Sequence, residues 1–249
     1  MEPMESQSRR RVLILAYAAH PQASMESRVG WHRAIASARE HDTWVLYGDE
    51  YDRADLADMA LRAGVERIRF VRAPHGKLAA RLVRSPQLFW HGYALWHRAA
   101  YRLAERLHRK LQFDLLHQVS FCGYREPGYT WQMDAPFIIG PVGGTHNFPW
   151  RYLGQIDFPG AVREIFRNAA NVMQFRYRRR VQYAYRKAAC VLTANQTAQC
   201  DLHHVLGVRS HRLLETGIAH APGRERGRRD SSEPLRILWA GRLRSWKAL

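Results

Sequence analysis

The feature that most constrains the fold of this 249-residue chain is a series of short apolar runs. Most of the runs are continuous rather than alternating between apolar and polar residues, which is typical of β-strands covered on both faces. They are VLILAYA (12–18), TWVLYG (43–48), RIRFV (67–71), DLLHQV (114–119), PFIIG (136–140), CVLTA (190–194), RLLETG (212–217) and RILWAG (236–241).

Segments with helical periodicity lie between several of these runs, at 28–40, 54–64, 86–111, 161–189 and 195–207. The last of them begins after Asn195, a favourable N-cap residue, and ends on Gly207, a residue type that commonly terminates helices. Strands that alternate with helices in this way predict an α/β fold, a Rossmann-like doubly wound parallel sheet with helices on both faces.

A polar segment near the C-terminus divides the predicted domains. HAPGRERGRRDSSEP (220–234) is rich in Gly, Pro and Ser and has no apolar face, so it is interpreted as a linker. Residues 1–219 are expected to form one domain. Residues 235–249 contain a strand and a glycine turn, which are too little to fold alone. The chain is therefore expected to be a truncated protein or a fragment that ends on the first element of a second domain.

The chain is strongly basic, with 39 Lys and Arg against 22 Asp and Glu and a formal net charge of +17. Much of this charge lies in two stretches, 98–110 and 176–187, and aromatic residues accompany the second. Such a run marks either a solvated helix face or a peripheral contact with an anionic membrane. A nucleic-acid partner is less favoured, because the surrounding pattern is that of a doubly wound enzyme.

Cysteine usage and the N-terminus point to a reducing compartment. The cysteines Cys122, Cys190 and Cys200 are odd in number and show no C-x-x-C spacing, which argues against a disulfide framework or a zinc knuckle. Two glutamates precede the first arginines, no cleavage site follows the first apolar run, and no stretch is long enough to span a bilayer. We expect a cytoplasmic protein, either soluble or peripheral at the cytoplasmic membrane face.

The candidate site residues follow the ends of predicted strands, where open parallel sheets bind ligands. Glu26 and Gly30 follow the first strand, and Gly30 marks either a phosphate-approaching turn or a simple turn at the start of a helix. HQVSFCGYREPGY (117–129) and GPVGGTHNFPW (140–150) follow the fourth and fifth runs and have the composition of cleft-shaping loops. His117 is a catalytic candidate or a core histidine, and Arg125 with Glu126 is a site element or a surface pair.

Four stretches together resemble the front part of a GT-B glycosyltransferase of the family 4 type. They are E-x-x-V-G-W (26–31), HQVSF with REPGY (117–129), GPVGG with PW (140–150) and LRILWAGRL with KAL (235–249). Ser24 and Met25 stand where relatives often have Gly and Ser, and Val119 stands where many have a second His.

The resemblance implies transfer of a sugar from a nucleotide-diphosphate sugar to a glycan or lipid-linked acceptor, with retention at the anomeric carbon. Arg242 and Lys247 would hold the donor diphosphate, with Gly30 beneath it, because fixed cations stabilise the charge that develops on the leaving group. The acceptor side would comprise Glu26, His117, Arg125, Glu126, Gly143 and Gly144. No cofactor is expected, and no metal, since a D-x-D motif is absent from the sequence. The alternative is a non-catalytic module that binds an acceptor or partner through the first domain alone.

Overall fold

The computed structural model describes residues 8–48, 52–85, 88–121 and 123–215. Within them, seven strands form one sheet in the order β3-β2-β1-β4-β5-β6-β7, with parallel pairing throughout. The strands are β1 (Arg11–Ala16), β2 (Asp42–Tyr47), β3 (Ile68–Arg72), β4 (Leu115–Ser120), β5 (Phe137–Val142), β6 (Cys190–Thr193) and β7 (His211–Arg212). The first six strand predictions are confirmed. The seventh, at 212–217, is too long: β7 includes only Arg212 of that run, and residues 213–215 are not strand. The eighth, at 236–241, lies outside the described residues.

The helices are α1 (Met25–Glu40), α2 (Arg53–Arg62), α3 (Lys77–Val83), α4 (Phe89–Leu111), α5 (Phe158–Tyr177), α6 (Arg179–Lys187) and α7 (Gln196–Leu206), with 3₁₀ turns η1 (Thr130–Gln132) and η2 (Trp150–Gln155). The predicted caps of α7 are confirmed. The Asn195 side chain accepts a hydrogen bond from the Ala198 amide at 2.8 Å, and Gly207 ends the helix in the left-handed conformation. Helix α3 had no counterpart among the predicted segments.

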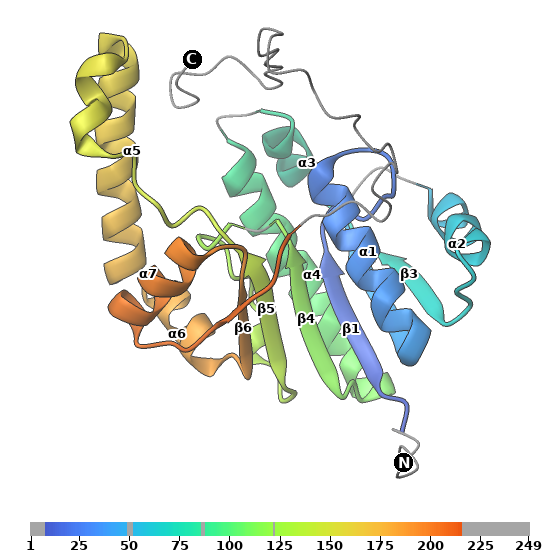
Figure 1. Cartoon of the computed structure of the whole chain (residues 1–249). Helices are drawn as coiled ribbons and strands as arrows, with labels where there is room; N and C mark the ends of the chain where they lie inside the picture. The colour runs from blue at the N-terminus through green and yellow to red at the C-terminus, as the bar shows by residue number, and fades with distance from the viewer. Residues whose placement is uncertain (1–7, 49–51, 86–87, 122, 216–249) are drawn as a thin grey trace, which may run out of the picture. The chain divides into compact units, whose positions relative to one another are not determined.

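Helices cover both faces of the sheet, as the doubly wound prediction requires (Figure 1). One core lies between the sheet and α4, α6 and α7, and it contains Trp96, Tyr185 and Leu202. The other lies between the sheet and α1 and α2, and it contains Trp31 and Leu56. Because successive residues of β1 alternate between these two cores, that strand is apolar from Val12 to Ala16 rather than at every second position.

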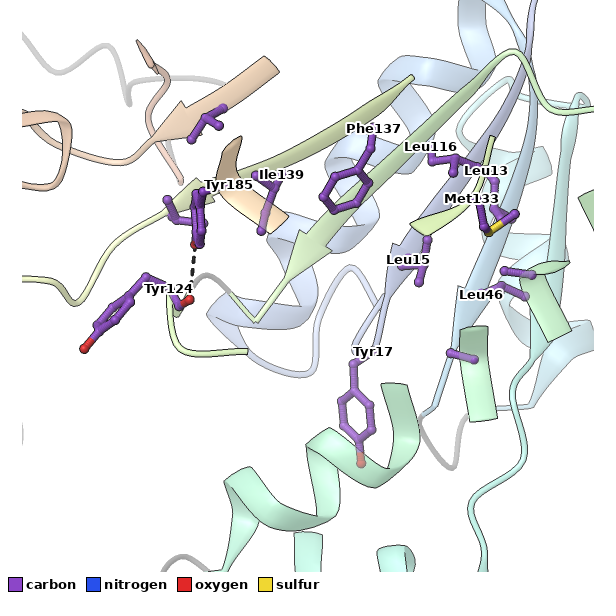
Figure 2. Packing of buried hydrophobic residues seen from close by; sticks show 14 of the residues in the cluster. Leu13, Leu15, Tyr17, Leu46, Leu116, Tyr124, Met133, Phe137, Ile139 and Tyr185 are labelled. Atoms are coloured by element: carbon purple, nitrogen blue, oxygen red, sulfur yellow. Dashed lines mark hydrogen bonds between the residues drawn. The ribbon is translucent and has the colours of Figure 1, made fainter. Parts of the chain in front are cut away.

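The register of the sheet places apolar side chains in rows across neighbouring strands. Leu13 of β1 lies opposite Leu116 of β4, which in turn lies opposite Phe137 of β5. All three belong to the core on the α4 side (Figure 2). At the edge of this cluster the Tyr185 hydroxyl donates a hydrogen bond to the carbonyl of Tyr124 at 3.3 Å, which ties α6 to the loop after β4.

The order of the strands reverses direction at β1. The chain builds β2 and β3 on one side of β1, then crosses back through α3 and α4 to place β4 on the other side. In open parallel sheets such a reversal leaves a crevice beyond the carboxyl ends of the two central strands, because their following loops diverge to opposite faces. The loops after β1 and β4 are therefore where a ligand is expected.

The stretch 161–189 was expected to be a single helix, and this prediction is wrong. The helix breaks at Arg178, whose φ of −77° and ψ of 96° are not helical, and α5 and α6 are separate elements. The Arg178 guanidinium donates to the carbonyl of Arg125 at 3.1 Å, so a tertiary contact accompanies the break. Helical periodicity carries no signal for such a contact.

The described residues form two compact units, one of 8–146 with 172–215 and the other Asn147–Asn171. The predicted linker at 220–234 and the predicted strand and turn at 235–249 lie outside the described residues, so the domain boundaries stay a prediction.

None of the helices in the described part of the chain combines the length and hydropathy that a bilayer crossing requires.

Candidate functional site

The loops after β4 and β5 meet at the carboxyl edge of the sheet. Gly123 and Gly143 form an isolated parallel bridge, and the Tyr124 amide donates to the Gly143 carbonyl at 3.3 Å. The structure thus brings Gly143 next to the turn that carries Arg125. Both loops continue from adjacent strands of a parallel sheet, which explains why segments about twenty residues apart in the sequence lie together.

Gly144 is the exposed point of this junction. Its φ of +74° lies in the left-handed region, which residues with a side chain rarely adopt, and a Cβ built there would meet no atom within 4 Å. Glycine is therefore required by the backbone conformation rather than by lack of space. The turn leaves peptide groups accessible at the sheet edge, where they can bind a polar ligand.

Glu126 does not form the surface pair with Arg125 that the sequence left open. Its carboxylate is buried and pairs with the guanidinium of Arg180 from α6. The same guanidinium lies 4.6 Å from the centre of the Tyr129 ring, and the Gln118 amide donates to the Glu126 carbonyl at 2.9 Å. Glu126 thus anchors the loop after β4 from inside, and its carboxylate is not presented to solvent.

His97 of α4 lies behind this loop and is fully buried. Burial, and secondarily the nearby charge of Arg180, lower the pKa of His97 to about 3, so the ring is neutral near pH 7. A neutral ring avoids placing a second cation beside Arg180. No local pattern predicts that His97 and Arg180 share an environment, because they are separated by more than eighty residues.

His117 lies on β4, with its Nε2 2.9 Å from the carbonyl oxygen of Gly140. Since a carbonyl can only accept, the neutral ring carries its proton on Nε2. Burial lowers the pKa of His117 to about 4, an effect that the Gly140 carbonyl opposes and the charge of Arg33 reinforces. A partly buried histidine held neutral in this way, with Nε2 bonded to a backbone carbonyl, has a structural contact in the sheet, and its catalytic role stays a prediction.

Gly30 is not at the start of a helix, and that expectation is wrong. Helix α1 begins at Met25 because Ser24 and Ser27 form a capping box, in which the Ser24 side chain accepts from the Ser27 amide. Gly30 therefore lies one turn inside the helix. A Cβ there would approach the Ala18 carbonyl oxygen to 2.2 Å, so this glycine allows α1 to pack closely on the loop after β1.

Glu26 lies in the exposed first turn of α1. A carboxylate in this position interacts favourably with the positive end of the helix dipole. The amides at the start of α1 therefore lie at residues 25–27, several positions before Gly30. Any phosphate-binding role for this helix start belongs to the amides of residues 25 and 26 rather than to Gly30, because the Ser27 amide is bonded to the Ser24 side chain.

Aromatic side chains that were not among the predicted site residues line the end of β1. The Tyr17 hydroxyl lies 3.0 Å from Nε2 of His75, and its ring contacts those of Phe89, Tyr93 and Phe121. The Tyr93 hydroxyl also accepts from the Phe121 amide at 2.6 Å, which fixes the exit of β4. Tyr93 is fully buried and Phe89 partly buried, so these rings of α4 support the end of β1 from one face of the sheet.

Arg242 and Lys247, the expected diphosphate ligands, lie outside the described residues. Within the residues that the structure describes, no group of three or more His, Cys, Asp or Glu side chains is arranged to hold a metal ion. The described side of the candidate site therefore consists of Gly143, Gly144 and Arg125 at the sheet edge, Glu26 at the start of α1, and buried residues that support them.

Comparisons with known proteins give a likeness of fold only. No protein-family model matches this chain, and no curated protein matches it. The crystal structure of TcCGT1 in complex with UDP is similar with a TM-score of 0.47 and 12% identity, over 88% of this chain and 54% of that one. The chain thus spans about half the length of that protein. A short chain dehydrogenase from Mycobacterium smegmatis is similar with a TM-score of 0.29 and 15% identity, over 74% of this chain and 57% of that one. At these TM-scores neither likeness assigns a family or an activity.

Proposed function

We propose that this chain is the acceptor-side part of a glycosyltransferase, one that transfers a sugar from a nucleotide-diphosphate sugar to a glycan or lipid-linked acceptor with retention. The observation that carries the proposal is the junction between Tyr124 and Gly143. It joins the two motif-bearing loops, 117–129 and 140–150, at the sheet edge where a doubly wound fold binds its ligands.

The described residues are suited to binding rather than to proton transfer. His117 is neutral and hydrogen-bonded to Gly140, and the carboxylate of Glu126 is paired with Arg180. Neither is placed to exchange a proton with a bound acceptor. In this proposal Glu126, His117 and the buried Gly143 hold the acceptor loops in place, while Glu26, Arg125 and Gly144 face the acceptor.

Stabilisation of the leaving diphosphate would then belong to Arg242 and Lys247. Catalysis by cations at a departing phosphate requires no general base and no metal, because the developing negative charge is met by groups that are already positive. This division of roles is what the GT-B resemblance implies, and the neutral ring of His117 and the paired carboxylate of Glu126 support it.

Peripheral contact with an anionic membrane belongs to the same proposal, and Arg98, Arg102, Arg106 and Lys110 of α4 are its exposed cations. Arg180, which lies in the second basic stretch, does not take part. Its guanidinium is committed to Glu126 and Tyr129. A lipid-linked acceptor would bring the enzyme to such a surface, but a solvated helix face has the same composition.

The acceptor edge can be tested with two glycines that share a backbone conformation. Gly144 has φ +74° and Gly64, at the end of α2, has φ +73°, and neither has an atom within 4 Å of a built Cβ. Alanine at either position should lower the free energy of unfolding by a similar amount, about 1–2 kcal/mol, because each substitution forces a side chain into the left-handed region. Only Gly144 lies at the proposed site.

Binding of free oligosaccharides and of polyprenyl-linked sugars in detergent would be measured by saturation-transfer NMR. We expect Gly144→Ala to weaken binding of an acceptor that the wild-type chain recognises, while Gly64→Ala leaves binding unchanged at equal stability. Two results would contradict the assignment of the acceptor edge. One is that the wild-type chain binds none of the tested acceptors, and the other is that both variants lose the same amount of acceptor binding.

A further inference from the structure

Helix α5 presents apolar residues to solvent along most of its length. Phe158 is 81% exposed, Phe166 71% and Met173 63%. Together with the exposed Ile165, Val172 and Tyr177 they recur at positions i, i+7, i+8, i+14, i+15 and i+19, which is the spacing of one helix face. We call these six residues the apolar stripe of α5.

The opposite face of the same helix is polar and buried. Glu164, Asn168 and Asn171 are each no more than 3% exposed. Asn168 accepts from the Phe148 amide and donates to the Phe148 carbonyl, both at 2.8 Å, and the Asn171 amide donates to Asn147 at 3.1 Å. The Glu164 carboxylate pairs with Arg167 at 2.9 Å and with Arg163 at 3.4 Å.

These contacts fix which face of α5 points outward. A rotation of the helix that buried the apolar stripe would break the two hydrogen bonds of Asn168 to Phe148 and the bond from Asn171 to Asn147, and each buried polar group left without a partner is costly. The exposure of the stripe is therefore built into the fold. A continuous exposed apolar face of this kind marks a binding surface.

The charges around the stripe identify the kind of surface that it fits. From Phe158 to Lys187 the only acidic residue is Glu164, which is buried and paired. The exposed charges of this stretch include Arg176 and Arg179. An apolar face flanked by arginines, whose chains can extend toward phosphate groups, matches the boundary between headgroups and acyl chains of an anionic bilayer.

Aromatic residues in the turn before α5 add to this match. Trp150 is 62% exposed, and Tyr152 is exposed with the Arg151 guanidinium 4.7 Å from its ring centre. Tryptophan and tyrosine favour the interfacial zone of a membrane because each has an apolar ring and a polar group.

We propose that the apolar stripe of α5 inserts into the surface of an anionic lipid bilayer and holds the protein there peripherally. The inference stands on the exposure and charge of α5. It depends neither on sugar transfer nor on the arginines of α4. A second copy of the chain fits this face less well, because the two stripes would bring arginines together with no exposed acid in this stretch to pair with them.

The test uses the whole 249-residue chain and sedimentation with two kinds of vesicle, phosphatidylcholine alone and an equimolar mixture with phosphatidylglycerol. We expect binding to the mixed vesicles that high salt weakens. Phe166→Ser should reduce the partition coefficient about tenfold, which is the effect of withdrawing one large apolar side chain from the bilayer. Arg176→Gln and Arg179→Gln should each reduce it about fivefold.

The matched control is Leu61→Ser. Leu61 is an exposed apolar residue on α2, and its loss should not change vesicle binding. Thermal melts of all variants should coincide with that of the wild type, because none of the substituted side chains is buried.

A labelling experiment distinguishes the bilayer from other occupants of the stripe. In Phe166→Cys the new thiol should react rapidly with a water-soluble maleimide in the free protein and slowly with mixed vesicles present, with the site of labelling read by mass spectrometry. Leu61→Cys should react rapidly in both conditions.

Slow labelling of Phe166→Cys in the free protein would show that the chain or a second copy already covers the stripe. Vesicle binding that Phe166→Ser leaves unchanged would show attraction by charge alone. Either result overturns the proposal.

Discussion

Arg180 of α6 is paired with Glu126 of the loop after β4, and both side chains are shielded from solvent, with exposures of 17% and 4%. The two residues are more than fifty positions apart in the chain. Their contact, together with the position of Arg180 over Tyr129, fixes the loop that follows β4 against the α6 side of the sheet.

Removal of one partner of this pair should be costly. Glu126→Gln is expected to lower the free energy of unfolding by about 2–4 kcal/mol, because Arg180 would keep its charge without a counter-ion in a mostly buried place. The control is Asp114→Asn, which breaks an exposed pair with Arg11 and should cost less than about 1 kcal/mol. Urea denaturation measures both values.

A double substitution separates a buried pair from a general packing defect. Glu126→Leu with Arg180→Met should recover most of the stability lost in Glu126→Gln, because neither charge then remains unpaired. If the double variant lost as much free energy of unfolding as Glu126→Leu and Arg180→Met lose in sum when made singly, the result would contradict the pairing.

The close approach at Gly30 predicts a second stability effect. Gly30→Ala should destabilise the fold by about 1–3 kcal/mol or more, since a methyl group would be forced against the Ala18 carbonyl and α1 would have to move. Gly154→Ala is the control, because nothing lies within 4 Å of its built Cβ, and it should change stability by less than about 1 kcal/mol. Equal thermal midpoints for the two variants would show that α1 is not held against the β1 loop.

The two buried histidines make stability depend on pH. The pKa of His97 is lowered to about 3 and that of His117 to about 4, both mainly by burial. An unfolded imidazole titrates near 6.5, so as the pH falls below that value the unfolded chain takes up protons that the folded chain does not. The free energy of unfolding should therefore decrease with falling pH. The slope is at most about 1.4 kcal/mol per pH unit for each histidine, and less for His117, which is only partly buried.

The decrease in the free energy of unfolding levels off once the pH falls below the folded-state pKa values of the two histidines. His97→Gln and His117→Gln should each flatten the difference in stability between about pH 7 and pH 5, and the double variant should flatten it most. Carboxylates titrate in the lower part of this window, so the comparison is between each variant and the wild type at the same pH. An unchanged pH dependence in the double variant would contradict the burial of both neutral rings.

The central strands β1 and β2 were predictable from the sequence because they are buried on both faces. Runs such as VLILAYA are apolar at every position, and the caps of α7 are local signals that need no tertiary information. The break between α5 and α6 was not predictable. It coincides with a contact from Arg178 to a carbonyl fifty-three residues earlier, and no periodicity records such a contact.

The candidate site was only partly predictable, for the same reason. Composition placed Gly143 and Arg125 in loops at one sheet edge, but it could not separate Glu126 from its neighbour Arg125. The carboxylate of Glu126 turns inward to a residue on another helix. Gly30 was misplaced because the capping box of Ser24 and Ser27 starts the helix earlier than the glycine suggested. Helix α5 buries polar residues and exposes apolar ones because the side chains of Asn168 and Asn171 form hydrogen bonds with residues outside the helix. The sequence pattern alone does not show these bonds.

The central claim is that this chain takes part in sugar transfer from a nucleotide-diphosphate sugar, and its most direct test is binding of that donor. Saturation-transfer NMR with UDP- and GDP-sugars should detect weak binding to the 249-residue chain. The binding should require the diphosphate and should be lost in Arg242→Ala and in Lys247→Ala, while Leu61→Ser binds as the wild type does. Failure to bind any nucleotide-diphosphate sugar, or binding that both substitutions at 242 and 247 leave intact, would contradict the account.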